Sequence, residues 1–237
     1  MDEQPGGKVL IKEILRGSPA EKARLQPGDH LLRINETTVR SAQDTARTVG
    51  KNSAGSVVRI AILRRNAEHV VPVRLQPFPS HEELLRMQHV GRPAPPLQGL
   101  RTVVGTQGPT LADFQGKVLL IDFWASFCIA CRVTTNHLNQ WHARYASRGL
   151  DVLGIAAEPS DAVARGARRF GIRYPTCADP DMTTTAAYHV SELPALMLVD
   201  RKGIVRDVAT GYDPARVRQM DALIQQLLSE PVPSKSP

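Results

Sequence analysis

The sequence predicts an α/β protein in which a central mixed sheet is flanked by helices and a smaller, β-rich domain comes first. Between residues 118 and 228, short apolar runs alternate with helical patterns, which is typical of βαβ units. Two strand-like runs within residues 195–209 predict an antiparallel hairpin added to those units. Residues 8–75 carry several short strands and only two short helical stretches.

The composition is that of folded globular domains, not of a disordered chain. Hydrophobic residues make up 42% of the 237 residues and charged residues 22%, which is ordinary for globular proteins. Lys and Arg number 30 against 23 Asp and Glu, so the formal net charge is +7. No basic tract interleaved with aromatic residues is present, so we expect no nucleic-acid binding and assign the charge to solvated surface.

Breaks in the pattern divide the chain. Pro77-Phe78-Pro79 ends the β-rich part, Ser80 and Glu83 have the spacing of a capping box that starts a short helix, and residues 91–96 are rich in Pro. The last residues are rich in Pro and Ser. We therefore expect four segments: a first domain over 6–76, a linker with a short helix over 77–98, a second domain over 99–230 and a disordered tail over 231–237.

Targeting signals are not evident in the sequence. The longest apolar runs, such as residues 195–199, are far shorter than the roughly 20 residues that span a bilayer. The first seven residues are acidic and lack the basic and apolar regions of a signal peptide. Either the protein is cytoplasmic or the sequence is a trimmed part of a longer chain, and three cysteines do not decide the compartment.

Local patterns predict the individual elements. In the first domain we expect strands over 9–11 and 30–34, helices over 18–25 and 42–49, and a hairpin of 56–63 with 69–75. In the second domain we expect a hairpin around 105–108, strands over 118–123, 151–156, 195–199 and 204–209, and helices from the cysteine pair onward, over 161–170 and over 214–228.

A dithiol pattern follows the strand over residues 118–123. Cys128 and Cys131 stand three positions apart at the start of a helical pattern, so both face one side. Unpaired N–H groups and the helix dipole lower the pKa of a thiol at the first position, which makes Cys128 the nucleophile. A zinc site needs a second cysteine pair, and the remaining cysteine is Cys177, which we expect to be a buried, small apolar residue. We expect no metal and no cofactor.

The first domain resembles bacterial PDZ domains of the HtrA type. The resemblance rests on residues 17–29, read as GSPAEKARLQPGD, and on the following Leu31-Leu32-Arg33-Ile34-Asn35. Arg24 stands where the family has a glycine, so the turn after the first helix is expected to change. The family's carboxylate-binding loop and ligand-pairing strand come before the strand over 9–11, where this chain has few residues. We therefore expect an incomplete, structural module, or a working peptide binder if the gene begins upstream.

The second domain resembles the thioredoxin superfamily, and within it the TlpA/ResA-like extracytoplasmic thiol–disulfide oxidoreductases. The motifs that carry the resemblance are GRPAP at 91–95, LADFQGK at 111–117, DFWASFCIACR at 122–132, GIRYP at 171–175 and YHVSELP at 188–194. The resemblance implies a thioredoxin fold, with Cys128 as the attacking thiol and Cys131 as the more buried, resolving thiol.

Further site residues are carried over from the same resemblance. Asp122 matches the buried acid of thioredoxins and Glu158 the acid of the ResA-like group, and burial raises such a pKa toward neutrality. Pro194 matches the cis-proline that faces the cysteines, preceded by Leu193. We expect a docking rim for partner proteins at Trp124, Phe127 and Leu193, although Trp124 equally suits a core position.

The sequence thus predicts a thiol–disulfide oxidoreductase that reduces protein disulfides. Ile129-Ala130 between the cysteines gives no direct charge stabilisation, so we expect a moderately reducing couple. The expected partners are protein thiols and disulfides, an upstream thiol electron donor that is either soluble or membrane-bound, and a peptide or protein at the PDZ-like domain. We expect a periplasmic location, with membrane association if the chain starts upstream. An adaptor whose second domain is only a scaffold, and a metal chaperone, are the alternatives.

Overall fold

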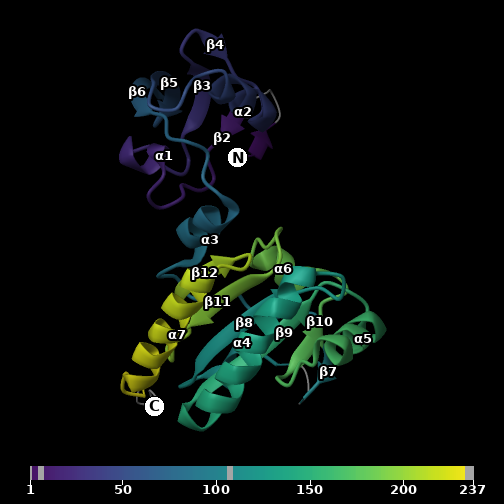
Figure 1. Ribbon diagram of the computed structural model, residues 1–237. Coiled ribbons are helices and arrows are strands. Elements are labelled where there is room, and N and C mark those ends of the chain that lie inside the picture. The colour runs from purple at the N-terminus through teal and green to yellow at the C-terminus, as the bar shows by residue number, and fades with distance from the viewer. Residues whose placement is uncertain (1, 5–7, 106–108, 233–237) are drawn as a thin grey trace. The chain divides into compact units, whose positions relative to one another are not determined.

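The computed structural model describes residues 2–4, 8–105 and 109–232, with side chains from residue 9 onward (Figure 1). The chain divides into two compact units, Met1–Pro79 and Ser80–Pro237. Most of the tail over 231–237, expected to be disordered, lies outside the described residues. None of the described helices is both long and apolar enough to cross a membrane.

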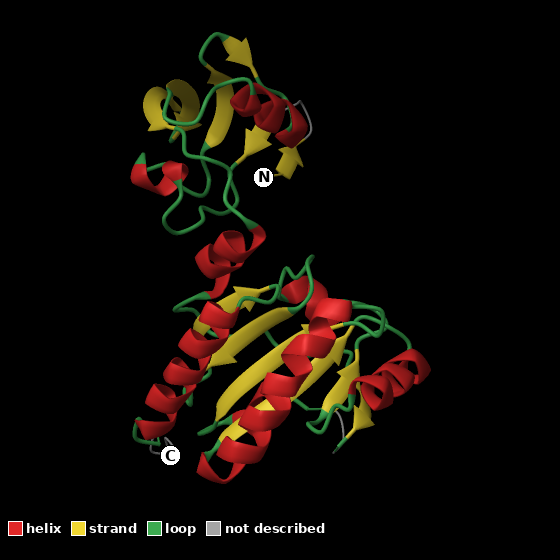
Figure 2. Cartoon of the chain, in the orientation of Figure 1, coloured by secondary structure: helices red, strands yellow, loops and turns green. Residues whose placement is uncertain are grey.

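The first unit is a six-stranded, mainly antiparallel sheet with two short helices (Figure 2). Its strands follow the order β1-β2-β3-β5-β6, and β4 pairs with β3. The elements are β1 (Asp2–Gln4), β2 (Lys8–Leu10), α1 (Pro19–Lys22), β3 (His30–Ile34), β4 (Thr37–Thr38), α2 (Ala42–Gly50), β5 (Val57–Arg64) and β6 (Ala67–Arg74).

Local sequence explains the helix starts in this unit. The hydroxyl of Ser18 accepts the N–H of Glu21 at the start of α1, and the hydroxyl of Ser41 accepts the N–H of Asp44 at the start of α2. Alternate residues of the strands then face one core, which includes Val9, Leu31, Ile34, Val58, Ile60 and Ile62. The unit therefore has a hydrophobic core of its own.

A strand precedes β2 in the structure. β1 pairs antiparallel with β2, with Glu3 opposite Val9, and forms the end of the sheet order. The turn between them, residues 5–7, lies outside the described residues. That the domain is incomplete stays a prediction, as does its HtrA type.

Arg24 occupies the position that the sequence marked as unusual. Its φ is 61°, so the arginine adopts the left-handed conformation for which a glycine is suited. The turn after α1 thus keeps the backbone geometry expected of a glycine. The substitution is absorbed as local strain rather than as a changed turn.

The second unit is built on a mixed sheet in the order β12-β11-β8-β9-β10-β7. Its elements are α3 (His81–His89), β7 (Arg101–Val104), the 3₁₀ helix η1 (Leu111–Phe114), β8 (Val118–Trp124), α4 (Ile129–Tyr145), the 3₁₀ helix η2 (Ala146–Arg148), β9 (Leu150–Ala156), α5 (Ser160–Phe170), β10 (Thr176–Ala178), α6 (Thr183–Ala187), β11 (Ala195–Val199), β12 (Val205–Thr210) and α7 (Pro214–Ser229).

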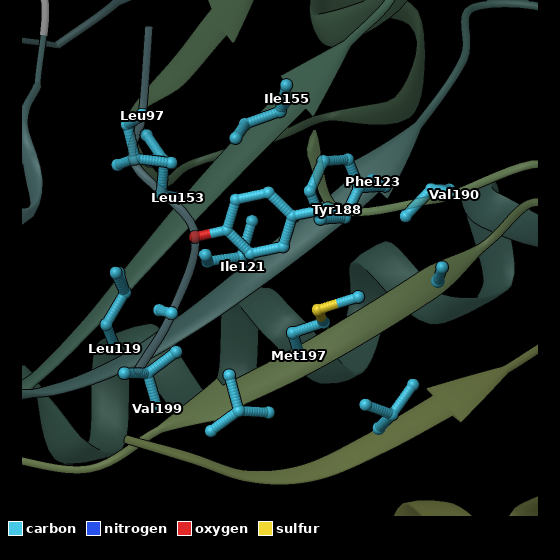
Figure 3. Close-up of a cluster of buried hydrophobic side chains, with 14 of the residues drawn as sticks. Leu97, Leu119, Ile121, Phe123, Leu153, Ile155, Tyr188, Val190, Met197 and Val199 are labelled. Atoms are coloured by element: carbon cyan, nitrogen blue, oxygen red, sulfur yellow. The ribbon is translucent and has the colours of Figure 1, made fainter. Parts of the chain in front are cut away.

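Central strand β8 is buried along its whole length and serves two cores. Val118 and Leu120 face one layer, where they pack with side chains of α4 and α7. Figure 1 shows these two helices over the same face of the sheet. Leu119, Ile121 and Phe123 face the opposite layer, where they pack with Tyr188 and other side chains (Figure 3). The continuous apolar run that predicted this strand is explained by burial on both faces.

Most of the expected linker over 77–98 packs with the second unit, while the domain boundaries themselves stay a prediction. α3 packs on β12, Leu85 is fully buried, and Arg86 pairs with Asp207. The N–H of Gly91 donates to the carbonyl of Val205 at 2.8 Å. The capping box and the leucines predict an amphipathic helix at this position. The strand on which it packs, β12, lies more than 100 residues further along the sequence.

β7, the strand before residues 105–108, does not pair with the segment from residue 109 onward as the expected hairpin requires. β7 pairs antiparallel with β10, and residues 111–114 form a 3₁₀ helix rather than a returning strand. Residues 106–108 themselves lie outside the described residues. β7 therefore closes the edge of the sheet through a contact between distant segments.

Candidate redox site

Cys128 and Cys131 form a disulfide at the amino end of α4. Cys128 is the N-cap residue, and its Sγ accepts the backbone N–H of Cys131 at 3.1 Å. Cys131 is 1% exposed and packs with Trp124, whereas Cys128 is only half-buried. The predicted difference in exposure between the two sulfurs is confirmed. A helix N-terminus that donates to the outer sulfur stabilises a thiolate there once the disulfide is reduced.

Asp122 lies on β8, the strand that leads to this cysteine pair. Its carboxylate is 1% exposed, and Oδ2 accepts the hydroxyl of Tyr174 at 2.8 Å. Burial raises the pKa of Asp122 to about 7, although the hydrogen bond from Tyr174 acts in the opposite direction. Side chains alternate along a strand, so Asp122 shares a face with Trp124, which packs against Cys131. The structure therefore supplies a buried acid that titrates near neutral pH.

Glu158 lies in the loop between β9 and α5, where it binds the segment before the cysteines. Its Oε2 accepts the backbone N–H of Ser126 and its Oε1 accepts the Ser126 hydroxyl, both at 2.6 Å. The guanidinium of Arg169 donates to the carbonyl of Ser126. Glu158 thus holds the loop that leads into Cys128, a contact that sequence reasoning did not foresee.

The Leu193–Pro194 bond is cis, as the resemblance predicted. β11 pairs antiparallel with β8 so that Ala195 lies opposite Phe123, which places this turn at the carboxyl end of β8 beside the cysteines. Leu193 and Cys128 pack against the same buried cluster. The Pro194 carbonyl accepts the N–H of Gly211 at 2.8 Å.

The expected docking rim is divided by the structure. Trp124 is 1% exposed and packs against Phe170, so it belongs to the core and is not available to a partner. Phe127 is 74% exposed and fits the rim. Ile129 is 83% exposed and Val133, one helical turn further along α4, is 40% exposed. The apolar surface beside the disulfide is therefore formed by Phe127, Ile129 and Val133.

Cys177 is buried on β10 and is not part of the disulfide. Burial raises the pKa of its thiol, which keeps the sulfur protonated at neutral pH. This agrees with the expectation of a small apolar residue.

Three contributors to the site were not singled out from the sequence: Tyr174, Ser126 and Arg169. Tyr174 stood in a quoted motif, and a buried tyrosine needs a partner for its hydroxyl, which is the one signal that pointed to it. Ser126 and Arg169 act through backbone and loop contacts that carry no sequence signature.

Two family models match this chain. The model of the AhpC/TSA family matches residues 90–208, half of the chain, and a PDZ domain model matches residues 2–75. The chain belongs to the AhpC/TSA family. Its first unit carries a PDZ domain.

Two curated proteins show sequence similarity to this family member. Protein DipZ of Mycobacterium tuberculosis is 35% identical over 150 residues, which cover 59% of this chain and 21% of DipZ. Thiol-disulfide oxidoreductase ResA of Geobacillus kaustophilus is 31% identical over 102 residues, which cover 43% of this chain and 59% of ResA. The matched segments thus span less than two thirds of either relative.

Solved structures agree on the fold of the second unit. A protein described as thiol:disulfide interchange protein DsbE from Chlorobium tepidum aligns with a TM-score of 0.54 at 27% identity, covering 59% of this chain and 98% of DsbE. A protein described as a disulfide isomerase from Bacteroides thetaiotaomicron aligns with a TM-score of 0.55 at 26% identity, covering 60% of this chain and 91% of that protein. The second unit of this AhpC/TSA family member has a thioredoxin fold.

Proposed function

We propose that the protein is a thiol–disulfide oxidoreductase that reduces protein disulfides through Cys128 and Cys131. The observation that carries this is the disulfide itself, placed at the amino end of α4 with one sulfur half-exposed and the other buried. The similarity to ResA and DsbE supports the same chemistry.

The cycle follows from the positions of the two sulfurs. In the reduced protein, the Cys128 thiolate attacks a substrate disulfide, one substrate sulfur leaves as a thiolate, and a mixed disulfide forms. Cys131 then transfers its proton to the Asp122 carboxylate, attacks the Cys128 sulfur and releases the second substrate thiolate. Two electrons have passed to the substrate, and the protein holds the disulfide seen in the structure.

An upstream dithiol restores the reduced state. One donor thiolate attacks Cys128, Cys131 leaves and takes the proton back from Asp122, and the second donor thiolate resolves the mixed disulfide. Protein disulfides are the proposed substrates because an apolar surface surrounds the half-exposed sulfur. We assign Glu158 the role of holding the Ser126 loop, since both its oxygens are engaged there.

We further propose that the first unit brings a peptide or protein partner to the enzyme, and that it is of the bacterial HtrA type. β1 ends the sheet order and lies at an edge to which an extended peptide can be added. The resemblance to TlpA/ResA-like proteins supports a location outside the cytoplasm, where protein disulfides are abundant.

Reduction of insulin by the purified protein with dithiothreitol as donor tests the proposed activity. Turnover above the uncatalysed rate that is lost in Cys128→Ser is the expected result. The same rate in Cys128→Ser and in the unchanged protein would overturn the proposal. Cys177→Ser is the matched control, because it removes the buried thiol and is expected to keep the activity.

A further inference from the structure

In the carboxylate of Asp122, one oxygen accepts a hydrogen bond and the other has no hydrogen-bond partner among the described residues. Asp122 Oδ2 accepts the hydroxyl of Tyr174 at 2.8 Å, and both side chains are almost wholly excluded from solvent. Asp122 Oδ1 is buried and has no hydrogen-bond partner among the described residues. An unpaired buried oxygen is costly, and a redox or catalytic role is one of the reasons for which proteins keep such a group.

We propose that Tyr174 is a positioning residue of the redox site: its hydroxyl holds Asp122 so that one oxygen is fixed and the other exchanges a proton with Cys131. The inference rests on the proposed function for its purpose, but the contact between the two side chains stands without it. The proton moves from the Cys131 thiol to the Asp122 carboxylate during resolution and returns during reduction, so none is gained or lost over the cycle.

The sequence around Tyr174 is arranged to bring the ring to Asp122. Gly154 on β9 is the register partner of Asp122 on β8, and a side-chain carbon at Gly154 would lie 3.2 Å from Cε2 of the Tyr174 ring. The same atom would lie 2.8 Å from Thr176 Oγ1, which is closer than real contacts allow. Since Gly154 has no side chain, the ring can lie over β9 and reach the neighbouring strand.

The backbone beyond the ring is also fixed. The N–H of Gly154 donates to the carbonyl of Pro175 at 2.8 Å, and the hydroxyl of Thr176 donates to the carbonyl of Tyr174 at 3.1 Å. These bonds attach the residues that follow the ring to β9 and β10. The backbone from which the Tyr174 ring extends is therefore fixed.

A side chain from the active-site helix completes the arrangement. Thr135 lies within hydrogen-bonding reach of the Tyr174 hydroxyl, and its own hydroxyl donates to the carbonyl of Cys131 at 2.9 Å. Cys131, Thr135, Tyr174 and Asp122 are thus linked within one buried layer. Thr135 therefore contacts both Cys131, the resolving cysteine, and Tyr174, whose hydroxyl binds Asp122.

Few groups compete with this pair for control of the carboxylate. The neighbours of Asp122 in the structure are Tyr174, which donates to it, and its register partners Gly154 of β9 and Leu196 of β11. Of these three, Tyr174 alone titrates; Cys131, which packs with Trp124 two positions along β8, titrates once the disulfide is reduced. Burial raises the pKa of Asp122, and the hydrogen bond from Tyr174 lowers it. The Tyr174 hydroxyl therefore limits how far the pKa of Asp122 rises above that of an exposed aspartate.

The test is the titration of Asp122 itself, read from its side-chain carboxyl ¹³C shift in the oxidised full-length protein. Tyr174→Phe removes the hydroxyl and keeps the ring, and the midpoint is expected to rise by about one pH unit. Tyr188→Phe is the matched control: Tyr188 is also fully buried, but its hydroxyl donates to the carbonyl of Pro95 in the opposite layer (Figure 3). An unchanged midpoint in Tyr174→Phe, or an equal shift in both variants, would overturn the proposal.

A second measurement remains if Tyr174→Phe does not fold. Replacing all tyrosines by 3-fluorotyrosine makes each phenol a stronger donor, and the Asp122 midpoint is then expected to fall; no change would count against the inference. Insulin reduction is measured separately. An inactive protein in which Asp122 still responds to Tyr174 would refute the proposed function but leave the positioning contact standing.

Discussion

The carboxylate of Glu158 binds both the backbone N–H and the hydroxyl of Ser126 at 2.6 Å, so a loop after β9 holds the loop that precedes Cys128. Removing this support in Glu158→Ala leaves two donors without their acceptor and loosens the approach to the disulfide. We expect kcat/KM for insulin reduction to fall about tenfold, since misplacing a reacting group by small distances costs this much or more.

Two variants separate loop support from loss of charge. Glu158→Gln keeps an oxygen for Ser126 and is expected to retain most of the activity. Asp161→Asn removes an exposed negative charge that pairs with Arg165 on α5 and is expected to have no effect. If Glu158→Ala and Asp161→Asn are equally active, Glu158 does not support the site.

The raised pKa of Asp122 makes stability depend on pH. Between pH 4 and 7 the unfolded chain has released the Asp122 proton and the folded protein still holds it, so the free energy of unfolding falls as pH rises to about 7. Above pH 7 both states are ionised at Asp122, and this group causes no further loss of stability. Asp122→Asn lacks this loss. The free energy of unfolding of the variant, relative to the unchanged oxidised protein, is expected to rise from pH 4 to 7 by on the order of 3–4 kcal/mol.

Denaturant unfolding at a series of pH values measures this difference. Asp161→Asn serves as the control because Asp161 is exposed, and an exposed ion pair contributes little. Parallel stability curves for Asp122→Asn and the unchanged protein would show that Asp122 is not a buried acid with a raised pKa.

The exposed side chains beside the disulfide predict discrimination by substrate size. Phe127→Ser and Ile129→Ser remove apolar area that a protein substrate buries, and we expect kcat/KM for insulin to fall three- to tenfold. Reduction of hydroxyethyl disulfide, which is too small to cover the surface, is expected to be unchanged. Val57→Ser is the control, because Val57 is an exposed apolar residue in the first unit. Equal losses on both substrates would mean that the two residues do not form a docking surface.

The left-handed backbone of Arg24 predicts a stabilising substitution. Arg24→Gly relieves the contact between Cβ and the backbone and is expected to stabilise the first unit by about 1 kcal/mol. Hydrogen exchange of β5 amides in the full chain reports this local stability. Lys22→Gly at the last residue of α1 is the control of opposite sign, because glycine loses more conformational freedom than lysine when it adopts helical backbone. A loss of protection in Arg24→Gly would contradict the strain assigned to this residue.

Local signals in the sequence predicted most of the second unit and the centre of its site. The cysteine spacing, the apolar run of β8 and the family motifs singled out Cys128, Cys131, Asp122 and Pro194; the structure joins the two cysteines in a disulfide and buries Asp122 on β8, while the roles of these residues stay predictions. Each of these signals lies within a short segment, or is carried by a motif of fixed order. Such information is available without knowledge of the three-dimensional packing.

Contacts between distant segments were beyond local patterns. Tyr174 donates to Asp122, which lies 52 positions earlier in the sequence. α3, at the start of the second unit, packs on β12, which lies near its end. The exposure of Trp124 was open for the same reason: an aromatic residue next to a site is either rim or core, depending on whether Phe170 packs against it. Only the folded arrangement decides between the two.

The central claim is that Cys128 attacks and Cys131 resolves, and trapping the mixed disulfide tests it most directly. Reduced Cys131→Ser protein, incubated with a disulfide-linked peptide, lacks the resolving thiol, so the account predicts a covalent peptide adduct on Cys128 that mass spectrometry detects and dithiothreitol removes. Cys128→Ser protein is predicted to give none, since both remaining thiols, Cys131 and Cys177, are buried. No adduct in Cys131→Ser, or an equal adduct in both variants, would contradict the account.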